Sequence, residues 1–477
     1  MNETDEEPDR GRSRRRVLAA AGSAFGAGLA GCGGDGGAET EADDPDQIET
    51  DETTPEPTAT TATTTVPAER GGDDFPPLGN YPVEGDSVTY GFTVPVSGPF
   101  SALGEAERRG YELAVQHLNE GGGWADSWTD LSGDGVLGYT VEGVVRDTAT
   151  DPAEARQAAA ELIDRDEALL VSGGASTAAA FTIQEVCQQE RVQYMAALTQ
   201  SPVLTGEQCA RYGFREMHTV SMGASALATT LTDELGEDGT FSVLYPDYAY
   251  GQSVQESVRR QFEGRGWTTG ETVSTPLGTE DYTTFLESIP QNETDVLVLG
   301  QFGNRGAQVL RRATEMGLAT DTTLAVPLID RTFLETAGSA IDGVYGTADW
   351  HWTRDERFSN AFTERFRAAY DQPPSSAARL AYAATMRYSA AVERAGTFYP
   401  PEVIRELEGN SYANTGLGRA LSRACDHQSI RSVYVLRGQE PDSGPAPVEI
   451  AETVDGSSVA YACSESPASE CELGDYR

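Results

Sequence analysis

Short apolar runs alternate with amphipathic segments along the chain from Asp86 onward. The run DSVTYGFTVPV is rich in β-forming residues, and EAERRGYELAVQHLNEGGG follows it with apolar residues at helical spacing and glycines at its end. A second helical segment, DPAEARQAAAELIDRD, begins with Asp151 as its predicted N-cap and Pro152 at the first helical position. The runs LGYTVEGVVRD, EALLVSGG and VQYMAAL have the pattern of strands between such helices.

The same alternation returns after Val220. The strand-like runs TFSVLYPD, TDVLVLGQ and TTLAVPLID alternate with the helical segments ASALATTLTDELG, GQSVQESVRRQFEGRG and NRGAQVLRRATEMG. Units of this length predict parallel sheets covered by helices on both faces, and two successive runs predict two similar α/β lobes, each doubly wound. The later segments RFSNAFTERFRAAYDQ and AARLAYAATMRYSAAVERAG are expected to pack on one of these lobes.

The loops that follow the predicted strands are the expected place for a ligand, since open α/β sheets bind ligands beyond the carboxyl ends of their strands. These loops carry glycines, hydroxyls and aromatic residues with few charges: PVSGPFSALG, SGGAST, ALTQSP, YPDYAYG, GQFGNRG and PLIDRT. In SGGAST, Ser176 and Thr177 precede a helix. They suit simple N-capping, and a capped helix start also attracts a carboxylate through its N–H groups and dipole. Asp330 in PLIDRT suits an N-cap equally well.

The N-terminus has the layout of an export signal. Ser13 and three arginines precede an apolar run over 17–30, which is shorter than the roughly 20 residues of a membrane-spanning helix. The pair Arg14–Arg15 resembles a twin-arginine signal. The sequence LAGC, ending at Cys32, resembles a lipobox, so cleavage before Cys32 and a lipid on its thiol are expected. A chance cysteine beside an ordinary cleavage site is the alternative.

Residues 32–85 are predicted to form a tether between this anchor and the folded body. From Gly33 to about Asp74 the chain is acidic and then rich in Thr and Pro, with almost no large apolar residues. Such a segment cannot bury enough surface to offset its ordering entropy, so we expect disorder. A lipid on Cys32 would hold the body at the extracellular face of the cell membrane, without a membrane-spanning helix.

The composition is strongly acidic. The 477 residues contain 34 basic side chains, all of them arginine, against 76 acidic ones, a formal charge of -42. This charge argues against a nucleic-acid partner. The absence of lysine excludes a phosphate-binding P-loop, which needs one. An acidic, lysine-free chain suits solubility at high salt, where a Debye length of about 3 Å at 1 M weakens self-repulsion. A GC-rich genome with an acidic tail is the alternative interpretation.

The remaining cysteines suggest disulfides outside the cell. Cys463 and Cys471 are close enough in the sequence to close a small loop, and Cys187 with Cys209 is a second plausible pair, which leaves Cys425 over. Sequence alone does not fix this connectivity. No metal site is predicted, because the four histidines are scattered, without ligand spacing to a cysteine pair. Asn292 begins Asn-Glu-Thr, a glycosylation acceptor sequence.

Taken in order, the loops resemble the substrate-binding proteins of branched-chain amino-acid and amide ABC transporters, the leucine/isoleucine/valine-binding family. The similarity covers about 86–438 and rests on GFTVPVSGPFSALGEAERRGYELAVQHLNEGGG, VVRDTATDPAEARQAAAELI, ALTQSPVLT, YPDYAYGQSVQESV and LRRATEMGL. The resemblance implies a periplasmic-binding fold of type I, with three crossovers in the hinge and a ligand in the cleft between two closing lobes. It also implies a permease and its ATPases as partners.

The family's binding positions carry over onto eight residues. Leu103 falls where the family often has a larger aromatic, and Asp330 is the nearest candidate for the acid that holds an α-ammonium. Without that acid, an amide or another neutral or anionic ligand would be favoured, because an unpaired buried charge is costly. The remaining positions are those that would hold the ligand carboxylate, Ser176, Thr177, Thr199 and Gln200, and those that would close from the second lobe, Tyr250 and Phe302.

We therefore expect a solute receptor of an ABC importer that captures a branched-chain amino acid or a related small amide or carboxylate. The alternative is a ligand-sensing ectodomain or co-receptor on the same fold. No catalytic residue or cofactor is predicted, because the chain lacks a Gly-x-Ser-x-Gly elbow and a metal-binding His pair. The expected organisation is a signal peptide over 1–31, the tether over 32–85, the first lobe over 86–218 and 349–425, and the second over 219–348, completed with the hinge and tail by 426–477.

Overall fold

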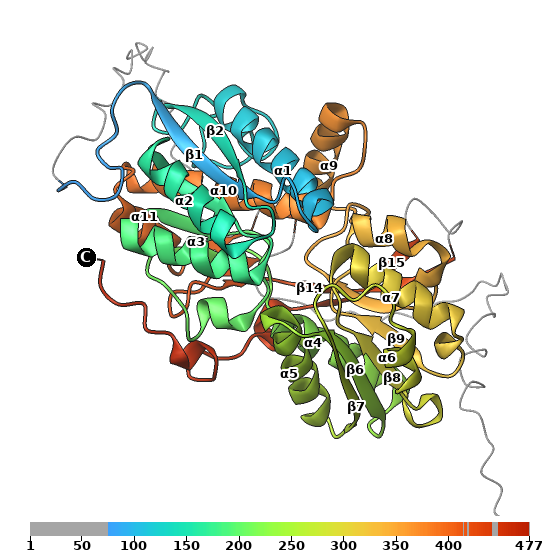
Figure 1. Cartoon of the computed structure of the whole chain (residues 1–477). Helices are drawn as coiled ribbons and strands as arrows, with labels where there is room; N and C mark the ends of the chain where they lie inside the picture. Colours follow the sequence, from blue (N-terminus) through green and yellow to red (C-terminus); the bar gives the residue numbers. More distant parts are fainter. Residues whose placement is uncertain (1–74, 414, 417–418, 441–446, 477) are drawn as a thin grey trace, which may run out of the picture. The chain divides into compact units, whose positions relative to one another are not determined.

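The computed structural model describes residues 75–413, 415–416, 419–440 and 447–476. The predicted signal peptide, the lipid anchor at Cys32 and the tether up to Asp74 lie outside the described residues. Two lobes, each built on its own sheet, make up the described part of the chain (Figure 1).

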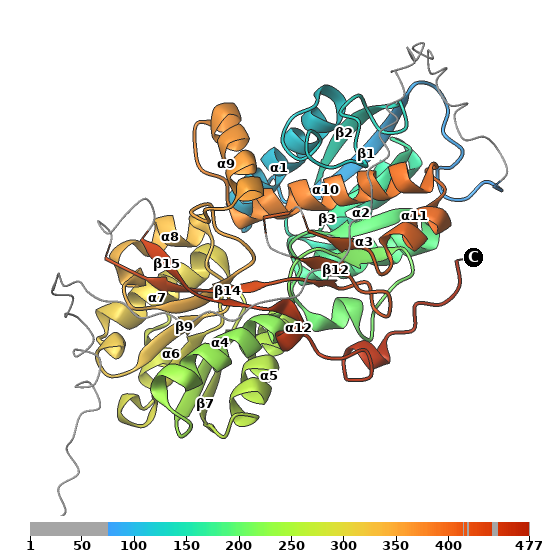
Figure 2. The same ribbon diagram turned by 180° about the vertical axis from the view of Figure 1, so that it is seen from behind.

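The first lobe contains a parallel sheet in the order β2-β1-β3-β4-β5. Helices α2 and α3 cover one face of this sheet, and α1 and α10 cover the other (Figures 1 and 2). The strands are β1 (Ser87–Val94), β2 (Thr140–Asp147), β3 (Ala168–Gly173), β4 (Gln193–Ala196) and β5 (Gly213–Arg215). The helices of this lobe are α1 (Ser101–Glu120), α2 (Pro152–Asp164), α3 (Thr177–Glu190), α9 (Arg357–Tyr370), α10 (Ser376–Ala395) and α11 (Pro400–Leu407).

The second lobe contains a sheet in the order β15-β14-β10-β9-β8-β6-β7, in which β14 is antiparallel to both of its neighbours, β10 and β15, and the other neighbouring strands are parallel. Its strands are β6 (Thr240–Pro246), β7 (Thr268–Thr275), β8 (Val296–Leu299), β9 (Thr323–Val326), β10 (Tyr345–Ala348), β14 (Val433–Gly438) and β15 (Val448–Val454). Its helices are α4 (Val220–Leu235), α5 (Ala249–Glu263), α6 (Thr283–Glu287), α7 (Gly303–Glu315), α8 (Arg331–Ala337) and α12 (Gly456–Val459). A small antiparallel sheet joins β11 (Ser411–Tyr412), β12 (Ala420–Ser422) and β13 (Ser429–Ile430).

Local sequence explains the element starts and the buried strands. Asp151 caps α2 by accepting hydrogen bonds from the N–H groups of Ala153 and Glu154, and Pro152 occupies the first turn, as predicted. Every residue of β3 and of β8 is buried, which is typical of strands in a parallel sheet covered on both faces. The alternating pattern and the sheet order confirm the predicted α/β fold of two doubly wound lobes.

The chain crosses between the lobes at three places: residues 216–219 between β5 and α4, 349–356 between β10 and α9, and 431–432 between β13 and β14. After β15 the tail returns to the first lobe, where the Tyr212 hydroxyl donates to the Tyr476 carbonyl at 2.6 Å. The tail, red in Figures 1 and 2, is therefore a further connection between the lobes beside the three predicted crossovers.

Two sequence-based predictions need correction. The disulfides join Cys209 to Cys471 and Cys425 to Cys463, while Cys187 is a buried thiol. Both predicted pairings are therefore wrong. They relied on proximity in the sequence, whereas the return of the tail places Cys471 beside a residue 262 positions earlier.

Residues 75–85, at the end of the predicted tether, are packed rather than disordered. The Phe75 ring stacks on Tyr399 with centroids 4.4 Å apart, and the Asn80 amide donates to the carbonyls of Ile163 and Ala168. The aromatic residues of this stretch provide the apolar surface that the preceding acidic residues lack.

Candidate functional site

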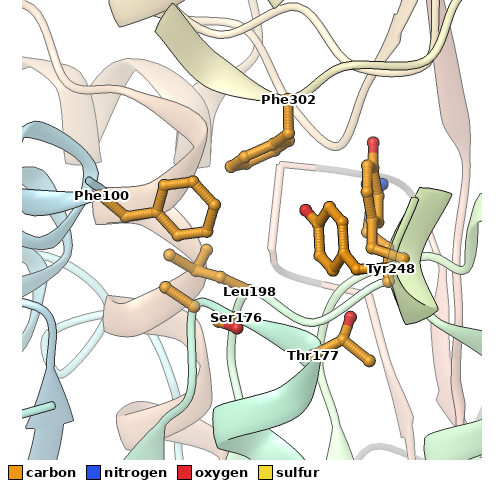
Figure 3. A pocket seen from close by; sticks show the side chains of 9 residues that line it. Phe100, Ser176, Thr177, Leu198, Tyr248 and Phe302 are labelled. Atoms are coloured by element: carbon orange, nitrogen blue, oxygen red, sulfur yellow. The ribbon is translucent and has the colours of Figure 1, made fainter. Parts of the chain in front are cut away.

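A pocket lies between the two lobes, at the carboxyl ends of their parallel strands. Side chains from both lobes line it: Phe100, Ala175, Ser176, Thr177, Leu198 and Gln200 from the first lobe, and Tyr248, Tyr250 and Phe302 from the second. Figure 3 shows the rings of Phe100 and Phe302 facing one another, with Ser176 and Thr177 on another side of the pocket. Five of the eight residues predicted from the sequence thus line one pocket.

The first lobe offers the start of a helix to this pocket. Ser176 is the N-cap of α3, but its hydroxyl makes no capping hydrogen bond, so the hydroxyl and the first N–H groups of α3 remain available to an anion. Gly174, at φ +81°, holds the preceding loop in a conformation that favours glycine, and a side chain there would collide with the Tyr194 hydroxyl. This arrangement suits a carboxylate bound by neutral donors.

The second lobe offers aromatic rings. Phe302 packs edge-on against Phe100 of the first lobe, with ring centroids 5.5 Å apart, and against Tyr250 at 5.8 Å. The cavity between these side chains has a volume of about 10 Å³, room for roughly one water molecule. A ligand the size of an amino acid therefore requires Phe100 and Phe302 to separate. Because the two rings belong to different lobes, an opening between the lobes separates them.

Two polar atoms at the pocket are buried without a hydrogen-bond partner in the described part of the chain: the Tyr250 hydroxyl and Oε1 of Gln200. Buried polar groups are generally hydrogen-bonded, so these atoms suit ligand contacts. Burial raises the pKa of Tyr250, so its hydroxyl stays protonated and is able to donate. All nine lining residues are uncharged, so the lining provides no counter-ion for a ligand.

The structure does not bring Leu103, Thr199 or Asp330 into the pocket lining. Leu103 is packed in the core of the first lobe. The Thr199 hydroxyl donates to the Gly174 carbonyl and so supports the loop behind Ser176. Asp330 caps α8 by accepting from the Phe333 N–H at 2.7 Å, and burial raises its pKa.

Sequence reasoning missed Phe100 and Tyr248 as lining residues. Phe100 lies three residues before Leu103, and its ring lines the pocket whereas Leu103 does not. Its position in the loop immediately before α1 was the available signal, because residues that precede a helix face the edge of the sheet. Tyr248 precedes α5 in the same way, in the loop that also carries Tyr250.

The described residues show neither a metal site nor a membrane span. Among them, no group of three or more His, Cys, Asp or Glu side chains is arranged to hold a metal ion. Within these same residues, no helix combines the length and the hydropathy needed to cross a membrane.

The fold and the pocket correspond to a known family: residues 87–444 match the model of the periplasmic binding protein family, and the chain belongs to it. A relative is the leucine-, isoleucine-, valine-, threonine- and alanine-binding protein of Pseudomonas aeruginosa, 22% identical over 333 residues, which cover 70% of this chain and 85% of the relative. The relatives are solute-binding proteins, and this chain is likewise a binding protein and not an enzyme.

Solved structures share this fold. A periplasmic binding protein from Burkholderia mallei has a TM-score of 0.73 and 22% identity, over 81% of this chain and 100% of that protein. A solute-binding protein of an ABC transporter from Rhodopseudomonas palustris, in complex with 3,4-dihydroxybenzoic acid, has a TM-score of 0.69 and 19% identity, over 78% and 98%.

Proposed function

We propose that this protein is the solute receptor of an ABC importer and that it captures a small carboxylate with an apolar body. One observation supports this most directly: the start of α3 in one lobe faces the aromatic rings of Tyr250 and Phe302 in the other. The carboxylate would bind the Ser176 hydroxyl and the N–H groups of α3. Closure of the aromatic wall would then exclude water and strengthen these hydrogen bonds.

The ligands of the relatives support this class of compound. The Pseudomonas relative is named for five amino acids, and the Rhodopseudomonas structure holds an aromatic acid. Both kinds of ligand are small carboxylates with an apolar part. The uncharged lining is compatible with either one, since the N–H groups at a helix start bind an anion without a counter-ion.

Delivery and location follow from the same proposal. The closed receptor would dock on a membrane permease whose ATPases supply the energy. We propose export through the twin-arginine signal over 1–31 and attachment by a lipid on Cys32, with the body at the extracellular face of the membrane. The acidic, lysine-free composition supports work in strong brine. The proposed lobe boundaries remain 86–218 with 349–425 for the first lobe and 219–348 for the second, with 426–477 as its completion together with the hinge and the tail.

The ligand class is tested by thermal shift of the purified protein at high salt. The panel contains branched and aromatic amino acids, the matching hydroxy acids, short carboxylates, amides and urea. We expect a rise in melting temperature with carboxylates that carry an apolar body, because a ligand stabilises the state it binds. If no carboxylate raises the melting temperature, the proposed ligand class is wrong.

The site itself is tested by the double substitution Ser176→Ala with Thr177→Ala. Loss of the two hydroxyls should weaken binding of any active carboxylate by about tenfold, the equivalent of about 1.4 kcal/mol. The matched control is Ser457→Ala with Ser458→Ala, two exposed hydroxyls at the start of α12, outside the pocket. Equal affinities of the two double variants would remove the start of α3 from the site.

A further inference from the structure

Gln200 is the pocket end of a chain of buried polar contacts that runs through the hinge. Its amide nitrogen Nε2 lies 3.2 Å from Nε2 of His218, and Nδ1 of His218 lies 3.0 Å from Oδ1 of Asp349. The same carboxylate oxygen accepts a hydrogen bond from Nη2 of Arg431 at 2.5 Å. His218, Asp349 and Arg431 lie in the first, second and third crossover, so each crossover contributes one member.

The buried charges in this series of contacts balance one another. Arg431 also donates to Glu216 at 2.8 Å, and Glu216 forms a second ion pair with Arg387 of α10. All of these groups are buried. Asp349 and Glu216 thus compensate the charges of Arg431 and Arg387.

The contact with the imidazole gives the direction of the Gln200 amide. Nε2 of His218 faces the amide nitrogen of Gln200, and an amide nitrogen can only donate, so Nε2 is the acceptor. The Thr347 hydroxyl, 3.4 Å from Nε2, donates to the Pro327 carbonyl instead. The NH₂ group of Gln200 is therefore the donor to Nε2, and Oε1 is the atom that Gln200 offers to the pocket that it lines.

We propose that Gln200 determines ligand specificity by accepting a hydrogen bond from an N–H or O–H group of the ligand, and that His218 is the positioning residue that directs it. Oε1 of Gln200 is buried and has no partner among the described residues, so a ligand without a donor would leave it unsatisfied. The ligand class is accordingly a carboxylate that also carries an amino, hydroxyl or amide donor. This inference rests on the proposed function and narrows it.

The test uses two ligand series that differ only at the carbon beside the carboxylate. One series is 3-phenylpropionate, phenyllactate and phenylalanine, and the other is 4-methylvalerate, 2-hydroxy-4-methylvalerate and leucine. Calorimetric titration of the wild-type protein should give a Kd about tenfold lower for a donor-bearing member than for the member with hydrogen at this position, the equivalent of one hydrogen bond. In Gln200→Leu this ratio should fall to about threefold or less, since the acceptor is gone.

His218 is tested by two substitutions, in each of which an atom of the new amide group takes the place of one ring nitrogen. His218→Gln places an amide oxygen where Nε2 stood, so it keeps the acceptor for Gln200, and the ratio should be retained. His218→Asn keeps a donor toward Asp349 but removes the contact with Gln200, so the ratio should fall as in Gln200→Leu. Ser253→Ala is the control, because it removes a neighbouring hydrogen bond to Ser201, 2.9 Å long, without touching Gln200.

The outcomes separate this inference from the proposed function. Equal affinities within a series for the wild-type protein, or an unchanged ratio in Gln200→Leu, would overturn the role of Gln200 while the carboxylate receptor stands. If no member of either series binds, both proposals are wrong. Should the His218 variants fail to fold, as judged by circular dichroism, the ratio in a folded Gln200→Leu variant decides the inference alone.

Discussion

The two lobes share one construction but present different chemistry to the pocket between them. The first lobe brings hydroxyls, backbone N–H groups and the amide of Gln200 beside the ring of Phe100, whereas the second brings three aromatic rings, including the Tyr250 ring with its hydroxyl. Parallel strands end in loops in both lobes, so the fold permits polar groups on either side. The difference indicates that the first lobe contacts most of the polar groups of the ligand and that the second lobe covers most of its apolar body.

Substitution of Gly174, in the loop of the first lobe that carries Ser176, should have the largest effect on ligand affinity. In Gly174→Val the new side chain would collide with the Tyr194 hydroxyl, and φ of +81° disfavours it further, so the loop that carries Ser176 must move. We expect a loss of carboxylate affinity of about 100-fold, since several charge-assisted hydrogen bonds depend on this loop. Titration calorimetry measures the change.

The matched control for this variant is Gly396→Val. Gly396 also has a positive φ, +65°, but it ends α10, and a Cβ added there would point into open space. The control should lower the melting temperature and leave the Kd unchanged. Weakened binding by both variants to the same extent would mean that general destabilisation, rather than the loop, is responsible.

Glu107, in α1 of the first lobe, makes the free energy of unfolding depend on pH. Burial raises the pKa of Glu107 to about 8, although the hydrogen bond from Tyr111 acts in the opposite direction. The unfolded chain releases this proton near pH 4.5, so the stability that Glu107 contributes is complete below that pH and is lost as the pH rises to about 8. The shift corresponds to a loss of about 5 kcal/mol in the free energy of unfolding.

Glu107→Gln should remove this loss. Denaturant titrations at pH 6 and pH 9 should show a smaller decrease for Glu107→Gln than for the wild-type protein. Glu120→Gln, an exposed position on the same helix, should behave like the wild-type protein. The prediction is contradicted if Glu107→Gln and the wild-type protein lose the same stability between the two pH values.

Phe302→Ala tests the aromatic side of the comparison. Loss of the ring removes apolar surface that would cover the ligand, so affinity should decrease by about tenfold, for carboxylates with and without a donor alike. The hydrogen-bond discrimination assigned to Gln200 should persist. Phe285→Ala, a half-buried ring on α6, should change stability without changing the Kd. A selective loss of the donor-bearing ligands in Phe302→Ala would show that the division between the lobes is wrong.

Asp330→Asn should have the smallest effect. Asn caps a helix about as well as Asp, so α8 should persist, and the leucine Kd should change by about twofold or less. If Asp330 instead held an α-ammonium group, leucine would bind much more weakly while its hydroxy-acid analogue would not. Parallel titrations with the two ligands distinguish these cases.

The sequence predicted the fold well because its periodicities are local. Runs such as LLVSG and helices such as the one that Asp151 caps are determined by their own residues, and helix cover on both sheet faces then follows from packing. The position of the pocket was predictable for the same reason, because the loops that follow parallel strands meet at one edge of each sheet.

The individual side chains were less predictable. Capping and ligand binding use the same residue types, so Asp330 and Ser176 could not be told apart before the structure placed only Ser176 at the pocket. Phe100 and Leu103 belong to the same helix start, and their different burial depends on how α1 packs on its sheet. The disulfides depend on where a distant tail returns, which spacing along the chain does not encode.

The Cys209–Cys471 disulfide joins two residues beside the first lobe. In the sequence, one of them precedes the second lobe and the other follows it. Every strand and helix from α4 to α12 therefore lies inside one closed covalent ring. A protease that cuts any single exposed loop within this ring leaves both fragments joined. A molecule cut once within this ring would thus remain a single covalent unit of almost unchanged mass without reduction.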